Sequence, residues 1–126
     1  MLCLGIESTA HTFGIGIVND KGKVLANQRS MYTTEKGGIH PIKATNHHIL
    51  LCDELIKNAL TEAKLKLSDI DLIAFAQGPG LGQTLRAGAV TARTLSKLLN
   101  IPLVGVNHCV AHIEIGKQKT KLEDPV

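Results

Sequence analysis

The feature that most constrains the fold is an apolar stripe between residues 42 and 64. Apolar side chains recur there at intervals of three and four, which places them on one face of an α-helix. The stripe consists of Ala44, His48, Leu51, Cys52, Leu55, Ile56, Ala59, Leu60 and Ala63. Pro41, a residue favoured in the first helical turn, precedes it. We therefore predict an amphipathic helix over residues 42–64 that packs one face against a core.

The segments around this helix predict an α/β domain. Residues 2–6, 13–18 and 23–33 read as a three-stranded antiparallel meander. The apolar run 70–76 reads as a strand buried on both faces, and 101–106 as another buried strand. Residues 82–99 and 108–115 read as helices, the second ending at Gly116. The order β-β-β-α-β-α-β-α is that of the ribonuclease-H-like fold, which also forms the half-domains of actin, hexokinase and Hsp70-type ATPases. We expect a mixed, mostly parallel sheet within residues 1–117, followed by a loose polar tail over residues 118–126.

Composition narrows the class of protein. A chain of 126 residues is long enough for one domain with its own core, and a net charge of +3 is too small to indicate nucleic-acid binding by itself. Three widely spaced cysteines in apolar surroundings are typical of reduced thiols rather than disulfides. With no segment of about 20 apolar residues, we expect a cytoplasmic protein without membrane contact.

Two histidines form a candidate metal clip. His108 and His112 are four residues apart on a predicted helix, so their Cβ atoms lie ~5–6 Å apart on one face and both imidazoles can reach one ion. With six histidines in the chain, chance remains a serious alternative. Cys109 stands where the zinc-protease motif H-E-x-x-H has its glutamate, which disfavours a protease. The sequence places no obvious third ligand nearby.

A second histidine pair gives a weaker signal. His47 and His48 are adjacent in the long predicted helix, so their side chains point about 100° apart and cannot share one ligand face. His48 belongs to the apolar stripe. We expect His48 to be packed and His47 to be solvated.

Two loops are candidates for ligand contact. Glu7, Ser8, Thr9 and His11 occupy a tight polar turn between two predicted strands, where backbone N–H groups and hydroxyls can cradle a phosphate. An ordinary hairpin that satisfies its own backbone explains the turn equally well. Gly78 and Gly80 flank Pro79 between a strand and a helix, and taken alone a tight turn is a better explanation there than a ligand loop. The loop is neither a P-loop nor a dinucleotide fingerprint.

Four ordered motifs together carry a resemblance to a known family. They are "LGIEST" near residue 4, "GGIHPIKATNHH" at 37–48, "AFAQGPGLGQTLRAGAVTARTLS" at 74–96 and "IPLVGVNHCVAHIEIGK" at 101–117. The chain resembles the tRNA threonylcarbamoyladenosine transferase family, formerly called O-sialoglycoprotein endopeptidase or glycoprotease. The last motif is similar to the archaeal and eukaryotic branch, the catalytic subunit of the KEOPS complex.

The resemblance implies an acyltransferase. It would pass a threonylcarbamoyl group from threonylcarbamoyl-AMP, formed with ATP, to the adenosine next to the anticodon in tRNA. It implies that His108 and His112 bind one divalent metal, iron or zinc, and that helices 42–64 and 82–99 face KEOPS partner subunits. Family members are about two and a half times longer and carry the third metal ligand in the part absent here, so we expect a fragment inactive alone. The alternatives are a noncatalytic scaffold of this fold, a superfamily ATPase and a metalloprotease.

Overall fold

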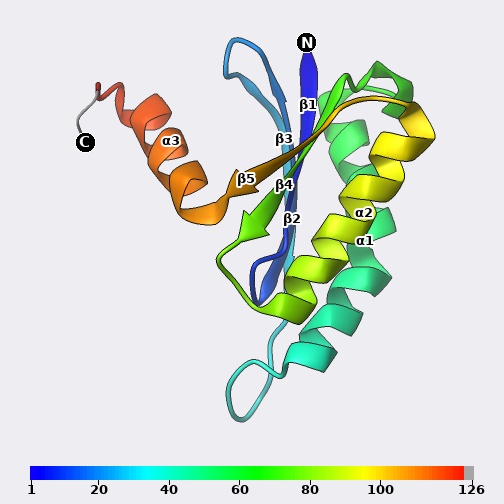
Figure 1. Ribbon diagram of the computed structural model, residues 1–126, viewed down its shortest axis with the longest axis vertical. Helices are drawn as coiled ribbons and strands as arrows, with labels where there is room; N and C mark the ends of the chain where they lie inside the picture. Colours follow the sequence, from blue (N-terminus) through cyan, green and yellow to red (C-terminus); the bar gives the residue numbers. More distant parts are fainter. Residues whose placement is uncertain (124–126) are drawn as a thin grey trace.

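The computed structural model describes residues 1–123 and contains five strands and three α-helices (Figure 1). Three strands come first and a long helix follows them, as the sequence predicts. In chain order the elements are β1 (Leu2–Glu7), β2 (Thr12–Asn19), β3 (Val24–Met31), α1 (Pro41–Ala63), the short 3-10 turn η1 (Leu67–Asp69), β4 (Leu72–Gly78), α2 (Gly82–Leu99), β5 (Leu103–Asn107) and α3 (His108–Thr120).

The strands form one mixed sheet in the order β3-β2-β1-β4-β5. β1 pairs with β2, and β2 with β3, in antiparallel fashion, whereas β4 pairs in parallel with both β1 and β5. The pairings are therefore evenly divided, and the expectation of a mostly parallel sheet is wrong in that respect. Helices α1 and α2 lie on one side of the sheet and α3 lies on the other (Figure 1). Parallel strands need a crossover, and α1 and α2 supply the two crossovers.

The core lies between the sheet and the pair α1 and α2. Alternate residues of the strands point to this side, as the two-residue repeat of a strand requires. Leu4 and Ile6 of β1 pair with Ile17 and Ile15 of β2, and all four are buried. Phe13 is the only aromatic residue among the buried core side chains of residues 1–123. The apolar stripe of α1 is confirmed by its buried members, which are Ala44, His48, Leu55 and Ala59.

The opposite face of the sheet is largely open. Small residues line this face: Gly5 of β1 pairs with Gly16 of β2 on one side and with Ala74 of β4 on the other. A groove of about 410 Å³ runs between these residues and α3. β4 and β5 were expected to be buried on both faces, but Ala74 is half-buried and Val104 is 44% exposed. That expectation is wrong because no helix of the described chain covers this face as α1 and α2 cover the other.

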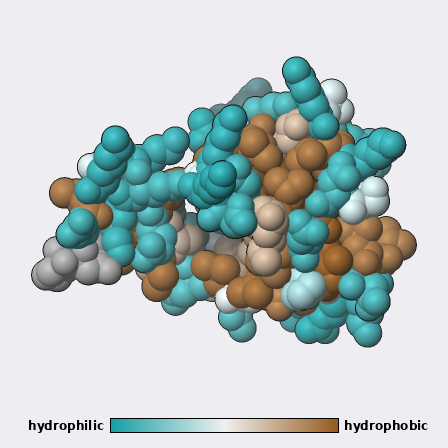
Figure 2. Space-filling view, turned by 90° about the horizontal axis from the view of Figure 1, so that it is seen from above, coloured by the Kyte–Doolittle hydropathy of each residue, from teal (hydrophilic) through white to brown (hydrophobic). Residues whose placement is uncertain are grey.

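Helix α3 is longer than the sequence suggests. It passes through Gly116 and ends at Thr120, where Lys121 adopts a left-handed conformation with φ 57°. The expected end at Gly116 is wrong, since glycine tolerates a helix interior at modest cost. Gln118, expected in a loose tail, lies in the helix and donates from Nε2 to the carbonyl of Gly22. The rest of that expected tail lies partly outside the described residues. In Figure 2, α3 forms a lobe beside the main body.

Within residues 1–123, none of the helices is long and apolar enough to cross a membrane.

Candidate metal and ligand site

The start of α3 positions the two predicted metal-binding histidines. Asn107 caps the helix, because its side-chain oxygen accepts hydrogen bonds from the backbone N–H groups of Cys109 and Val110 at 2.9 and 3.1 Å. His108 is then the first helical residue and His112 lies one turn further on. Their Nε2 atoms are 3.2 Å apart and the two ring planes stand at 87° to each other. The two rings are therefore nearly perpendicular, and their Nε2 atoms point toward each other.

This arrangement fits the demands of a metal ion. Two nitrogen ligands at ~2.0–2.1 Å from a tetrahedral ion are about 3.3 Å apart. The separation of 3.2 Å between the Nε2 atoms of His108 and His112 is close to that value. Both side chains belong to the first turns of one capped helix, which fixes their spacing. The pair could hold two coordination positions of one ion.

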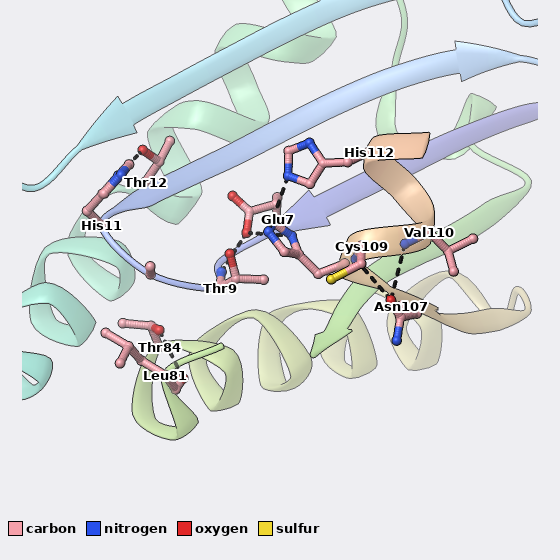
Figure 3. A network of polar contacts seen from close by, with 12 residues as sticks. Glu7, Thr9, His11, Thr12, Leu81, Thr84, Asn107, Cys109, Val110 and His112 are labelled. Atoms are coloured by element: carbon pink, nitrogen blue, oxygen red, sulfur yellow. Dashed lines mark hydrogen bonds and ion pairs between the residues drawn. The ribbon is translucent and has the colours of Figure 1, made fainter. Parts of the chain in front are cut away.

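The pair is incomplete within the described part of the chain. No group of three or more His, Cys, Asp or Glu side chains in residues 1–123 is arranged to hold a metal. The nearest acidic group is Glu7, whose Oε1 lies 3.9 Å from Nδ1 of His108. Figure 3 shows Glu7 at the end of β1, beside α3 and His112. The pair could therefore supply at most two of the usual three or four protein ligands of a metal.

The side chains of the polar turn after β1 point in two directions. Glu7 faces α3, and its Oε1 accepts a hydrogen bond from the N–H of Thr9 at 2.6 Å. Ser8 points the other way, is 1% exposed, and its Oγ has no hydrogen-bond partner within residues 1–123. This follows from strand alternation, since Leu4, Ile6 and Ser8 share the core side. Nδ1 of His11 contacts Oγ1 of Thr12 at 2.6 Å, away from the histidine pair (Figure 3).

The glycine-proline-glycine loop packs directly on this turn. A Cβ atom at Gly80 would lie 2.5 Å from the carbonyl oxygen of Thr9, so the position requires glycine. The N–H of Leu81 donates to the same carbonyl at 2.7 Å. Gly78 pairs with Asn107, which joins the loop to the start of α3. The loop therefore positions the turn after β1 from one side and adjoins the histidine pair on the other.

Helix α1 fixes the turn from a third side through its own histidines. Nε2 of His48 lies 2.8 Å from the carbonyl oxygen of Ala10, and Nδ1 of His48 lies 2.8 Å from Nδ1 of His47. His48 is fully buried, as predicted. His47 was expected to be solvated, but it is half-buried and its Nε2 contacts Oγ of Ser30 at 3.1 Å. Burial is the main cause that lowers the pKa of both histidines.

The predicted site residues thus converge on one region. The structure brings Glu7, Thr9, Gly78 and Gly80 together with His108 and His112, whereas Ser8 faces the core and His11 lies apart. Sequence reasoning missed Asn107, although an Asn before a predicted helix is a recognisable capping signal. It also missed the contact of His48 with Ala10, for which the sequence offers no signal because the two residues are 38 positions apart.

Comparison with known proteins places the chain in a family. The family model for tRNA N6-adenosine threonylcarbamoyltransferase matches residues 22–126. The chain belongs to this family. It is 56% identical over 126 residues to the tRNA N6-adenosine threonylcarbamoyltransferase of Thermococcus sibiricus and 55% identical over 127 residues to that of Caldivirga maquilingensis. All of the chain is covered in both matches, but only 38% of each relative.

Other relatives are longer still. A protein of Methanothermobacter thermautotrophicus, named a probable bifunctional tRNA threonylcarbamoyladenosine biosynthesis protein, is 51% identical over 126 residues, which make up 24% of its length. The chain described here therefore spans between about a quarter and two fifths of the length of these relatives.

Solved structures support the fold. YeaZ from Pseudomonas aeruginosa is similar with a TM-score of 0.74 at 18% identity, over 97% of this chain and 50% of YeaZ. RuvC from Thermus thermophilus, solved with a Holliday junction substrate, is similar with a TM-score of 0.54 at 10% identity, over 86% of this chain and 66% of RuvC. The chain has the ribonuclease-H-like α/β fold predicted from its element order.

Proposed function

We propose that this chain forms the N-terminal part of a tRNA N6-adenosine threonylcarbamoyltransferase. The complete protein would transfer the threonylcarbamoyl group from threonylcarbamoyl-AMP to the exocyclic amine of the adenosine next to the anticodon. Family membership supports the reaction. The observation that carries the site is the 3.2 Å separation of the His108 and His112 Nε2 atoms, with His108 lining the groove.

We propose that His108 and His112 hold one iron or zinc ion, with further ligands from outside the described residues. Such an ion, when bound, would act as a Lewis acid that stabilises negative charge on the carbonyl or phosphate of the acyl-adenylate. The chain's own contribution is to fix the two imidazoles: Asn107 caps α3 so that both rings stay on one face. Without the remaining ligands, we expect the 126-residue chain to be inactive alone.

We further propose that the turn after β1 and the glycine-proline-glycine loop contact the nucleotide portion of ATP or threonylcarbamoyl-AMP. Gly78 pairs with Asn107, the residue before His108, the Thr9 N–H donates to Glu7, and Glu7 and His108 line the same groove. Ser8 and Gly80 would act by shaping the turn, because one is buried and the other packs on Thr9. Hydrogen-bond donors at such a turn bind phosphate without strict sequence demands.

The partners of the proposed enzyme would be its tRNA substrate and KEOPS subunits. Apolar side chains are exposed on α1 and α2, including Ile49, Leu50 at 79% and Val90. Exposed apolar side chains on two neighbouring helices suit a protein partner. We propose that this pair of helices is the partner face, and that the protein works in the cytoplasm.

A chimera tests the proposed function. Residues 1–126 replace the aligned N-terminal part of the Thermococcus sibiricus relative, and modified adenosine in tRNA is measured by mass spectrometry together with bound metal. The chimera should modify tRNA and bind about one ion per chain. His108→Ala combined with His112→Ala should lower modification by more than about 100-fold, because loss of ligands exceeds the 10–100-fold cost of losing an outer-shell partner.

His40→Ala is the matched control, since His40 is exposed before α1 and lies outside the site. It should modify tRNA as the unsubstituted chimera does. Unchanged metal content together with unchanged modification in the double histidine variant would refute the proposed function of the pair.

A further inference from the structure

We propose that Glu7 is a positioning residue for His108: its carboxylate favours the proton on Nδ1, whose N–H points toward it, and thereby leaves the Nε2 lone pair directed toward the metal position. The proposal rests on the proposed metal site and extends it. It assigns to the carboxylate at the end of β1 a role that is separate from metal ligation and from contact with the nucleotide.

The two nitrogens of His108 face two different groups. Nδ1 lies 3.9 Å from Oε1 of Glu7, whereas Nε2 lies 3.2 Å from Nε2 of His112. A neutral imidazole carries a proton on one nitrogen and a lone pair on the other. A carboxylate beside Nδ1 favours the proton there, which leaves the Nε2 lone pair for a metal. Histidine ligands in metalloproteins almost always donate their other N–H to such an acceptor.

Glu7 does not qualify as a third ligand in this arrangement. Within residues 1–123, no three His, Cys, Asp or Glu side chains are placed to hold one metal ion, even though Glu7 adjoins the pair. Its carboxylate is on the Nδ1 side of His108, and the two ring nitrogens of an imidazole point in strongly divergent directions. A group that faces Nδ1 therefore contacts the ring on the side away from the metal position.

The carboxylate of Glu7 is itself held in place. Its Oε1 accepts the N–H of Thr9 at 2.6 Å, which ties the side chain to the turn. Two further contacts hold this turn: the N–H of Leu81 donates a hydrogen bond to the Thr9 carbonyl, and Nε2 of His48 contacts the Ala10 carbonyl. Three elements thus determine where Glu7 lies, so the acceptor is preorganised. The 3.9 Å separation is longer than a hydrogen bond, but such contacts commonly tighten when a site is loaded.

Metal titration and nitrogen NMR test this role on the chimera of residues 1–126 with the C-terminal part of the Thermococcus sibiricus relative, below called the unsubstituted chain, because further ligands are proposed to come from outside the described residues. Zn²⁺ binding is measured by calorimetry for the unsubstituted chain, Glu7→Gln and the double variant His108→Ala with His112→Ala. Glu7→Gln keeps an oxygen for the Thr9 N–H and removes the charge. We expect it to bind Zn²⁺ about 10- to 100-fold more weakly than the unsubstituted chain. Long-range ¹H–¹⁵N spectra at pH 8 should place the His108 proton on Nδ1 in the unsubstituted chain and shift it toward Nε2 in Glu7→Gln.

Glu114→Gln is the matched control, because Glu114 lies on the same helix and pairs with Lys117 at 3.5 Å. It removes the same charge and should bind Zn²⁺ as the unsubstituted chain does. Equal affinity in Glu7→Gln, or a His108 proton on Nε2 in the unsubstituted chain, would overturn the inference while the metal site stands. Equal Zn²⁺ uptake by the unsubstituted chain and the double histidine variant would overturn the metal site and the inference together. The spectra of the unsubstituted chain decide the matter even if Glu7→Gln does not fold.

Discussion

At the scale of single residues, a chain of neutral histidines connects α1 to the turn after β1. The Ala10 carbonyl can only accept, so His48 donates to it from Nε2. Neutral His48 then accepts at Nδ1 from Nδ1–H of His47, and His47 accepts at Nε2 from the Ser30 hydroxyl. Every contact is satisfied when both rings are neutral. A proton added to His48 would set two N–H groups against each other at 2.8 Å, unless the proton of His47 moved to Nε2 and the Ser30 hydroxyl turned to accept it.

This arrangement predicts a loss of stability in mild acid. Burial lowers the pKa of His48 below its usual value of 6.5, while the Ala10 carbonyl and the Glu7 carboxylate partly oppose the shift. The unfolded chain therefore binds more protons than the folded chain between the two pKa values. The free energy of unfolding should be fully retained above about pH 6.5 and should fall as the pH drops toward the depressed folded-state pKa. Urea titrations at a series of pH values measure this slope.

His48→Gln is the comparison, since its side-chain amide keeps a donor for the Ala10 carbonyl and does not titrate. Its free energy of unfolding should change less with pH over the same interval. Equal slopes in the two proteins would show that His48 makes no contribution to the pH dependence.

The sequence predicted part of this residue-level arrangement. His48 falls in the apolar stripe, so its burial followed from helical periodicity. The prediction for His47 was wrong because helix periodicity gives the direction of a side chain but not what stands in its path, and Ser30 of β3 approaches it from another element. The contact between α1 and Ala10 depends on how the helix is seated on the sheet, which no local pattern encodes.

At the scale of elements, the docking of two loops determines the site. The turn after β1 and the loop before α2 meet at Gly80, where the space available admits no side chain. The sequence indicated each loop separately, as a polar turn and a glycine-rich turn. It did not indicate that they touch, because the pairing of β1 with β4 brings them together across about 70 residues of chain.

Gly80→Ala should therefore destabilise the protein. The added Cβ would lie 2.5 Å from the carbonyl oxygen of Thr9 and 3.0 Å from its Cα, so backbone must move. Overpacking of this kind costs typically about 1–3 kcal/mol in the free energy of unfolding. Truncation of the Thr9 side chain should not restore the loss, because the nearest atom belongs to the backbone. Denaturant unfolding of Gly80→Ala and of its combination with Thr9→Ala gives the comparison.

Gly82→Ala provides the control within the same segment. A Cβ there would meet no described atom within 4 Å, and alanine is favoured over glycine in a helix by up to about 1 kcal/mol. Its unfolding free energy should be unchanged or slightly higher. A Gly80→Ala variant as stable as Gly82→Ala would contradict the close docking of the two loops.

At the scale of the whole molecule, the two faces of the sheet have different roles. One face is covered by α1 and α2, and the hydrophobic core lies there. The other face is open and lined by small residues. Apolar runs at 70–76 and 101–106 predicted strands correctly, but a run of apolar residues does not distinguish burial on two faces from burial on one. The element order predicted the fold because short crossovers leave few ways to assemble these strands.

Neighbouring positions of β2 should respond in opposite ways to substitution. Gly16 faces the open groove, where an added Cβ would have its nearest contact at 3.8 Å with the carbonyl of Ala26, while Ile17 is fully buried on the helix side. Gly16→Val should leave the free energy of unfolding unchanged or raise it by up to about 1 kcal/mol, since valine suits a strand better than glycine does. Ile17→Ala should lower it by about 2–5 kcal/mol through lost burial and a cavity. Paired urea titrations measure both, and a Gly16→Val variant destabilised as strongly as Ile17→Ala would mean that the glycine row serves internal packing. A stable Gly16→Val variant would instead mean that the small residues are not required for folding and keep the groove beside Glu7 and His108 open.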